Sequence, residues 1–164
     1  MKKLLYILLF AVLLLSGCEK NPAKFAPASL FLMDGDSTAA GIRIGDGPKA
    51  FRKAYKDYTV QVAFTGQSSS YRVMSIEKIP YDENISTIIA NFFIDGEPVS
   101  EDWLCKKNGV DLGGLHELLS STEYLQKHDV IYRYLSFRWE NGAITDIASE
   151  ELNYNETFET PRLD

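Results

Sequence analysis

The sequence predicts an α+β domain: an antiparallel sheet of about five strands with helices packed on one face. Several segments alternate apolar and polar residues and are joined by short turns, whereas parallel strands need connections of a dozen residues or more. The segment 48–58 instead repeats its apolar residues every three or four positions, as a helix does. With 164 residues, 45% of them apolar and 24% charged, the chain is expected to form one soluble domain.

Five segments have the composition and period of strands, namely 60–64, 71–79, 85–94, 130–139 and 144–147. In the third segment the inward-facing residues are expected to be Ile88, Ala90, Phe92 and Ile94. In the fourth they are Ile131, Leu135, Phe137 and Trp139.

Two dipeptides predict tight turns: Asp95-Gly96, and Asn141-Gly142, which is the strongest hairpin signal in the chain. A plain two-residue loop at Asn141-Gly142 would place the polar Asp146 on the Phe137 face. The sequence therefore predicts a bulge or a longer loop there.

Helices are predicted in two parts of the chain. Ile42 and Ile44 alternate as on a half-buried strand, a turn follows at 45–47, and Pro48 suits the first position of a helix. Residues 100–129 are expected to be helical or irregular, with Ser100 as a cap. The segment 120–123 has the spacing of a capping box.

The N-terminus has the pattern of a secretory signal peptide. Lys2 and Lys3 precede an uncharged apolar run from 4 to 15, which is shorter than the about 20 residues that cross a bilayer. Leu15-Ser16-Gly17-Cys18 resembles the lipobox of bacterial lipoprotein precursors. In that family the peptide is cut before the cysteine, whose sulfur receives a diacylglycerol. The other interpretation is an ordinary secretory signal in which Cys18 occurs by chance.

The lipobox resemblance implies an organisation for the whole chain. Residues 1–17 would be removed, 18–29 would tether the protein, 30–152 would form the domain, and 153–164 would be a polar tail. Two acyl chains on Cys18 would hold the protein stably on a membrane. The expected location is the cell membrane or the outer membrane, facing the periplasm or the cell exterior, with membrane lipid as a partner through acylated Cys18.

Charge excludes one class of partner and suggests another. The formal charge of the chain is −6, and it becomes two units more negative when Lys2 and Lys3 are removed, which argues against binding to nucleic acid. The predicted helix nevertheless carries a basic stripe of Lys49, Arg52, Lys53 and Lys56. This stripe is either a docking face for an acidic protein partner or anionic headgroup, or a solvated helix face.

A second, local resemblance covers residues 39–58. The sequence Gly41-Ile42-Arg43-Ile44-Gly45-Asp46, followed by Phe51 and Tyr55, is similar to a module of small envelope-assembly lipoproteins and of β-lactamase-inhibitor-like domains. The resemblance implies a helix packed on an antiparallel sheet, and protein binding rather than catalysis.

Signals for catalysis and for metals are weak. Asp34-Gly35-Asp36-Ser37-Thr38 resembles the nucleophile motif of haloacid-dehalogenase-type phosphatases, but that family needs a parallel α/β scaffold. As a calcium loop it would have Gly45 where a bidentate glutamate is required, so a polar turn is expected. Cys105, His116 and His128 fit no catalytic or metal-binding spacing, and Cys105 is interpreted as structural. No catalytic, cofactor-binding or metal-binding residues are predicted.

Two classes of function follow. The first is a membrane-anchored, non-catalytic module for protein binding or envelope assembly. The alternative is a small exported hydrolase using acidic residues such as Asp82/Glu83, Glu97/Glu101 or Glu150/Glu151. Adjacent strand residues point to opposite faces, so neighbours in sequence are not thereby a catalytic pair.

Overall fold

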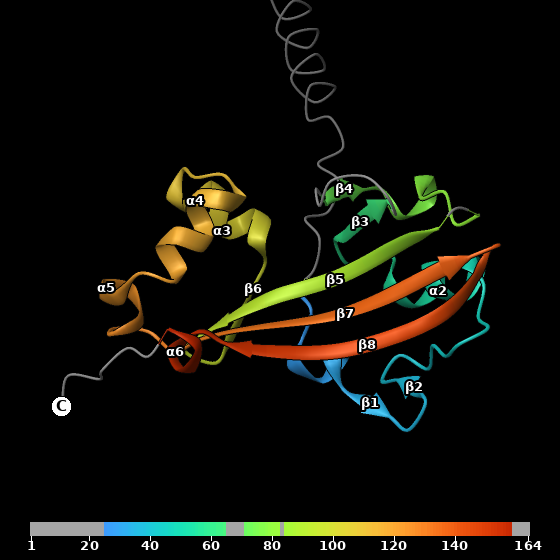
Figure 1. The fold of residues 1–164 in the computed structure, drawn as a ribbon, viewed down its shortest axis with the longest axis horizontal. Coiled ribbons are helices and arrows are strands. Elements are labelled where there is room, and N and C mark those ends of the chain that lie inside the picture. Colours follow the sequence, from blue (N-terminus) through green and yellow to red (C-terminus); the bar gives the residue numbers. More distant parts are fainter. Residues whose placement is uncertain (1–24, 65–70, 83, 159–164) are drawn as a thin grey trace, which may run out of the picture.

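The computed structural model describes residues 25–64, 71–82 and 84–158, and it confirms the α+β class and the antiparallel sheet (Figure 1). The sheet has six strands in the order β4-β3-β5-β7-β8, with β6 also paired to β5. Its strands are β3 (Val60–Phe64), β4 (Arg72–Met74), β5 (Ile85–Ile94), β6 (Glu97–Val99), β7 (Val130–Glu140) and β8 (Ala143–Asn153). Every pairing among them is antiparallel.

Helices cover both faces of the sheet rather than one, because Phe51 packs in the main core and Leu115 packs in a second core on the opposite face. Helix α2 (Pro48–Tyr55) lies toward one end of the long strands, and α3 (Glu101–Asn108), α4 (Leu112–Leu119) and α5 (Thr122–Leu125) lie together toward the other (Figure 1). The short elements are η1 (Ala28–Phe31), η2 (Ile76–Lys78) and α6 (Tyr154–Thr157). No helix in the described part of the chain is both long and apolar enough to span a bilayer.

Strand β5 is where the expected orientation is wrong. Ile85, Ile89 and Phe93 enter the main core, whereas Ile88 and its same-face neighbours lie on the other side of the sheet. On that side Phe92 belongs to a second core with residues of α3, α4 and α5. A strand that is covered on both faces has apolar residues at nearly every position, so its sequence does not show which face meets the larger core.

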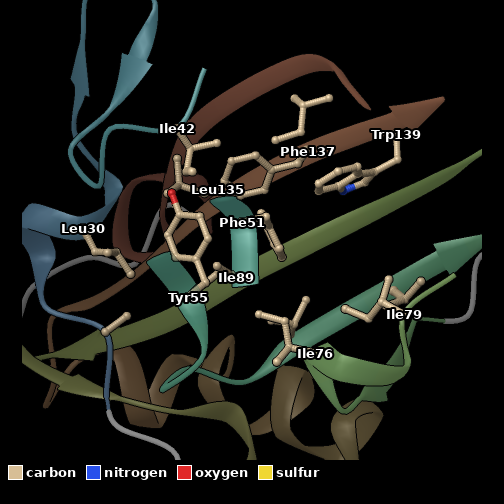
Figure 2. Packing of buried hydrophobic residues seen from close by; sticks show 14 of the residues in the cluster. Leu30, Ile42, Phe51, Tyr55, Ile76, Ile79, Ile89, Leu135, Phe137 and Trp139 are labelled. Atoms are coloured by element: carbon tan, nitrogen blue, oxygen red, sulfur yellow. The ribbon is translucent and has the colours of Figure 1, made fainter. Parts of the chain in front are cut away.

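Aromatic rings fill the main core, between α2 and β7 (Figure 2). The Phe51 ring lies edge-on to Phe137 and Trp139, at centroid distances of 5.0 and 5.2 Å. The indole Nε1 of Trp139 donates a hydrogen bond of 2.9 Å to Thr87 Oγ1. This face of β7, with Leu135, Phe137 and Trp139 fully buried, is as the sequence predicts.

The turn at Asn141-Gly142 is confirmed, and the expected bulge is present. Both residues have positive φ, 50° and 74°, as a hairpin turn of this kind requires. The register shifts between Arg138 and Trp139, which leaves Thr145 as the extra residue of β8. Ile147 is thereby paired with Phe137, so an apolar residue takes the place that Asp146 would otherwise have.

Two predicted strands are wrong in part. The segment 71–79 forms only the three residues of β4 and then turns into η2, which places Ile76 and Ile79 in the main core. The segment 42–44 makes a single bridge, from Arg43 to Ser37, and Ile44 is 59% exposed. The chain turns at Gly45, where φ is 92°, before a strand can extend.

Helix capping agrees with the sequence at one position and differs at another. Ser100 caps α3 as expected, with its Oγ accepting a hydrogen bond from Trp103 N. Helix α5 is capped by Ser121 and not by Ser120, whose Oγ instead donates to His116 O at the end of α4.

The packed domain extends further toward both termini than 30–152. Ala26 is buried in the main core, and its carbonyl accepts a hydrogen bond of 2.8 Å from Asn91 Nδ2. At the other end β8 continues to Asn153 and leads into α6, whose Tyr154 is buried in the second core. The expected tether at 18–29 and the tail at 153–164 therefore each contribute residues to the packed structure.

Candidate functional site

A pocket of about 570 Å³ lies where the sheet meets α3 and α4. Its floor is the sheet face opposite the main core, because Gln61 pairs with Ile88, and the even-numbered residues of β5 pair with those of β7. The floor consists of Gln61, Ile88, Tyr132 and Tyr134, the helices contribute Glu101, Leu112, Gly113 and His116, and Tyr71 completes the lining.

Glu101 is the buried acid of this pocket. It is the first residue of α3 and is only 8% exposed. Gln61 Nε2 donates a hydrogen bond of 2.5 Å to Glu101 Oε2. The capped start of α3 therefore presents a carboxylate to the sheet, and a side chain 40 residues earlier holds it in place.

Two tyrosines of the floor are neighbours of acids. Burial raises the pKa of the Tyr132 phenol far above its usual range, and its hydrogen bond to Glu101 raises it further. The hydroxyl of Tyr134 donates to Glu150 Oε2, and this bond raises the pKa of Tyr134 to about 12. Both phenols are therefore neutral hydrogen-bond donors at ordinary pH.

His116 lies at the helix side of the pocket and contacts the second core. Its Nδ1 shares a hydrogen bond of 2.8 Å with the Tyr154 hydroxyl, and the two rings are stacked. Burial raises the pKa of Tyr154 to about 12, so the phenol keeps its proton for this bond. The histidine ring is thus held in one orientation.

Cys105 lies beside the pocket, in a small adjoining hollow of about 60 Å³ that also touches Glu101 and Leu112. Burial raises the pKa of its thiol, and the negative charges of Glu101, Asp102 and Asp111 raise it further. A thiol with a raised pKa is a poor nucleophile because the thiolate is the reactive form. This chemistry agrees with a structural role for Cys105.

The acidic pairs considered for a hydrolase do not come together as pairs. Glu150 and Glu151 lie on opposite faces of β8, where Glu150 meets Tyr134 and Glu151 accepts a 2.6 Å bond from Arg133 Nε. Glu97 is exposed on β6 whereas Glu101 is buried. Asp82 is exposed, and Glu83 lies outside the described residues.

The basic stripe lies on α2 and its C-terminal cap, but its four residues differ in their surroundings. Lys49, Lys53 and Lys56 are exposed and have no ion-pair partner within the described ranges. Arg52 is partly buried, 3.7 Å from Glu77, with its guanidinium 5.5 Å from the centre of the Tyr81 ring. Arg52 is therefore part of the domain's own packing.

The remaining sequence candidates fall outside the pocket. Asp34-Gly35-Asp36-Ser37-Thr38 forms a small hairpin of β1 (Met33–Asp34) and β2 (Ser37–Thr38), which confirms the expected turn. His128 pairs with Asp95 at 2.7 Å, far along the chain from this hairpin. Across residues 25–64, 71–82 and 84–158, no three acidic, histidine or cysteine side chains gather as a metal site requires. Cys18 lies outside the described residues.

Most of the pocket was not predicted from the sequence. Gln61, Glu101, Leu112 and Tyr132 come from four separate elements, and no motif links them. The available signal was the apolar, aromatic character of both faces of β5 and β7, which suggests a second covered face.

Comparison of the chain with protein-family models, curated proteins and solved structures found no match.

Proposed function

We propose that this chain is a membrane-anchored lipoprotein that binds a ligand or a partner segment in the pocket between the sheet and α3 and α4, without catalysing a reaction. The observation that carries the proposal is the pocket itself, whose volume of about 570 Å³ lies within the ~300–1,000 Å³ of ligand sites. Its lining is mainly apolar and phenolic, with a few fixed polar groups, as binding sites have.

The membrane part of the proposal is supported by the sequence. Leu15-Ser16-Gly17-Cys18 follows an apolar run and resembles a lipobox, so acylated Cys18 would attach the protein to the cell membrane or the outer membrane. The pocket would then face the periplasm or the cell exterior, where an envelope protein partner or a small molecule would meet it.

A pocket-filling substitution tests the binding function. The backbone of Gly113 is helical, and an added Cβ would meet only Asp111 Oδ1, at an ordinary 3.5 Å. Gly113→Phe therefore adds a ring at a residue that lines the pocket, without straining α4. Gln126→Phe adds the same ring at an exposed position after α5 and is the matched control.

The experiment is cross-linking and capture of the full-length, lipidated protein from its own envelope, followed by identification of protein and small-molecule partners. The wild type and Gln126→Phe should retain the same stoichiometric partner, and Gly113→Phe should lose it. Identical partners in all three proteins would show that the pocket is not the binding site. No stoichiometric partner in any of them would overturn the binding function.

A small exported hydrolase is the second candidate, because Glu101 and His116 line the same pocket. An acid and an imidazole in one cleft are candidates for general acid–base catalysis. Screening the full-length protein on ester, amide and glycoside substrates tests this function. Turnover by the wild type that is abolished in Glu101→Gln would establish a hydrolase. Absence of turnover by the wild type would exclude the hydrolase function.

A further inference from the structure

Glu101 is a buried carboxylate that has no cationic partner among the described residues. It is 92% buried, and its hydrogen-bond donors, the amide of Gln61 and the phenol of Tyr132, are neutral. No lysine, arginine or histidine of the described ranges forms an ion pair with it. Removing a carboxylate from water is costly unless an opposite charge lies near it.

The surroundings of Glu101 make the pocket more negative. Asp102 and Asp111 act on the same region, since both raise the pKa of the neighbouring Cys105 thiol. Glu150 adds a further carboxylate behind Tyr134. Lys106 approaches Asp102 at 3.7 Å, on the exposed side of α3. The pocket lining itself contains no lysine or arginine among the residues described, so the charge of Glu101 would repel an anionic ligand.

The remaining lining suits the apolar part of a small cation. Tyr132 and Tyr134 lie with their ring centroids 5.9 Å apart, and Tyr71 is the third aromatic ring of the pocket. Aromatic faces attract ammonium groups, and more strongly where water is excluded. Ile88 and Leu112 offer aliphatic surface on opposite sides, from the sheet and from α4.

We infer that the pocket binds an organic ammonium ion, a small amine whose charge pairs with Glu101 and whose apolar portion lies among Tyr132, Tyr134 and Leu112. The inference depends on the proposed function, because it assigns the ligand class of the same pocket. It identifies the ligand by charge and size, since a pocket of about 570 Å³ admits one small molecule.

Three probes that share a phenyl ring and are similar in size separate charge from shape: benzylammonium, benzyl alcohol and benzoate. Each is titrated into the full-length protein in a non-ionic detergent, and binding is followed by ligand-observed NMR. Benzylammonium should bind at least about tenfold more tightly than the alcohol, because a charge pair in a partly buried site is worth more than a neutral contact. Benzoate should not bind.

Variants of the protein test whether the preference for benzylammonium depends on Glu101. Glu101→Gln should remove the preference for benzylammonium, whereas Glu117→Gln, the same change at an exposed residue of α4, should preserve it. Gly113→Phe should abolish the binding of all probes. Should Glu101→Gln fail to fold, the ratio of the wild-type affinities for benzylammonium and benzyl alcohol still tests the cation assignment.

Each result separates this inference from the function on which it depends. Equal binding of the ammonium and the alcohol, or an unchanged preference in Glu101→Gln, would overturn the cation assignment. If either of these results were found and Gly113→Phe still abolished probe binding, the pocket would remain the binding site. Absence of binding by all three probes would also overturn the cation assignment, and the capture experiment would decide the function.

Discussion

Asn91, in the middle of β5, donates a hydrogen bond of 2.8 Å from its Nδ2 to the backbone carbonyl of Ala26. Both residues are buried, at 4% and 1% exposure, and they are 65 residues apart in the chain. This bond fixes the first packed residues of the domain to a central strand of the sheet. A tether that began at Cys18 would therefore end at Ala26, eight residues further on.

Asn91→Ala should lower the free energy of unfolding by about 1–3 kcal/mol, because the carbonyl of Ala26 loses its buried donor. Chemical denaturation of the wild type and the variant measures the difference, and hydrogen exchange should show weaker protection around residue 26. Asn84→Ala, at an exposed position before β5, is the control and should change stability little. A stability of Asn91→Ala equal to that of this control would contradict the role of the bond.

Thr87 and Trp139 form a second buried hydrogen-bonded pair, in the main core. Thr87→Val removes the acceptor for the indole N–H, and because both residues are fully buried the cost should be about 1–3 kcal/mol. Trp139→Phe also leaves a cavity, so the pair is best measured by a double-mutant cycle. In the Trp139→Phe background, Thr87→Val should cost clearly less than in the wild type. Additive losses would show that the two side chains are not coupled.

Asp95 should make stability depend on acid pH. The hydrogen bond from His128, followed by that from Asp129 N, lowers its pKa below the ordinary value of 3.8. A lowered folded-state pKa gives stabilisation that is present above the unfolded-state pKa and is lost as the pH falls through the folded-state pKa. Because the pair is exposed, the effect should be less than about 1 kcal/mol.

Asp95→Asn tests this pH dependence with little backbone change, because asparagine also tolerates the positive φ of 54° found there. Denaturation at a series of pH values from about 6 to about 3 should show a smaller acid-dependent loss of stability in the variant than in the wild type. Parallel curves for the two proteins across that range would sink the prediction.

The basic stripe on α2 should divide into two kinds of residue. Arg52→Glu should destabilise the domain, since it places a carboxylate 3.7 Å or so from Glu77 and removes the contact with Tyr81. Lys53→Glu should leave stability within about 0.5 kcal/mol, as surface substitutions do. Reversal of Lys49, Lys53 and Lys56 together then measures docking without disturbing the fold. If partner binding and liposome binding survive this reversal, the stripe is a solvated helix face and not a docking face.

Cys18→Ala should abolish acylation of the protein. Each buried methylene of an acyl chain contributes about 0.8 kcal/mol, so two chains on Cys18 would hold the protein on the bilayer and their loss would remove that attachment. Fractionation of cells, with metabolic labelling by a fatty acid, measures both localisation and acylation. A wild type that took up no label, or a Cys18→Ala protein that still took it up, would contradict the lipobox assignment.

The sequence by itself determined the elements that depend on local chemistry. The Asn141-Gly142 turn and the β8 bulge follow from backbone preference and from the need to keep Asp146 off the Phe137 face. Helix α2 follows from Pro48 and the spacing of Phe51 and Tyr55. Each of these signals lies within a dozen residues of chain, so no distant contact was needed to interpret it.

Tertiary structure alone decided which face of β5 meets which core, and where the pocket lies. Both faces of β5 are apolar, so the side that received α2 and the side that received α3 and α4 depended on how distant segments packed. The pocket brings Gln61 to Glu101, and both to Tyr132, across three elements. Burial distinguishes Glu101 from the exposed acids, and among the described residues it has no ion-pair partner. Burial is a property of the packed fold rather than of the local sequence.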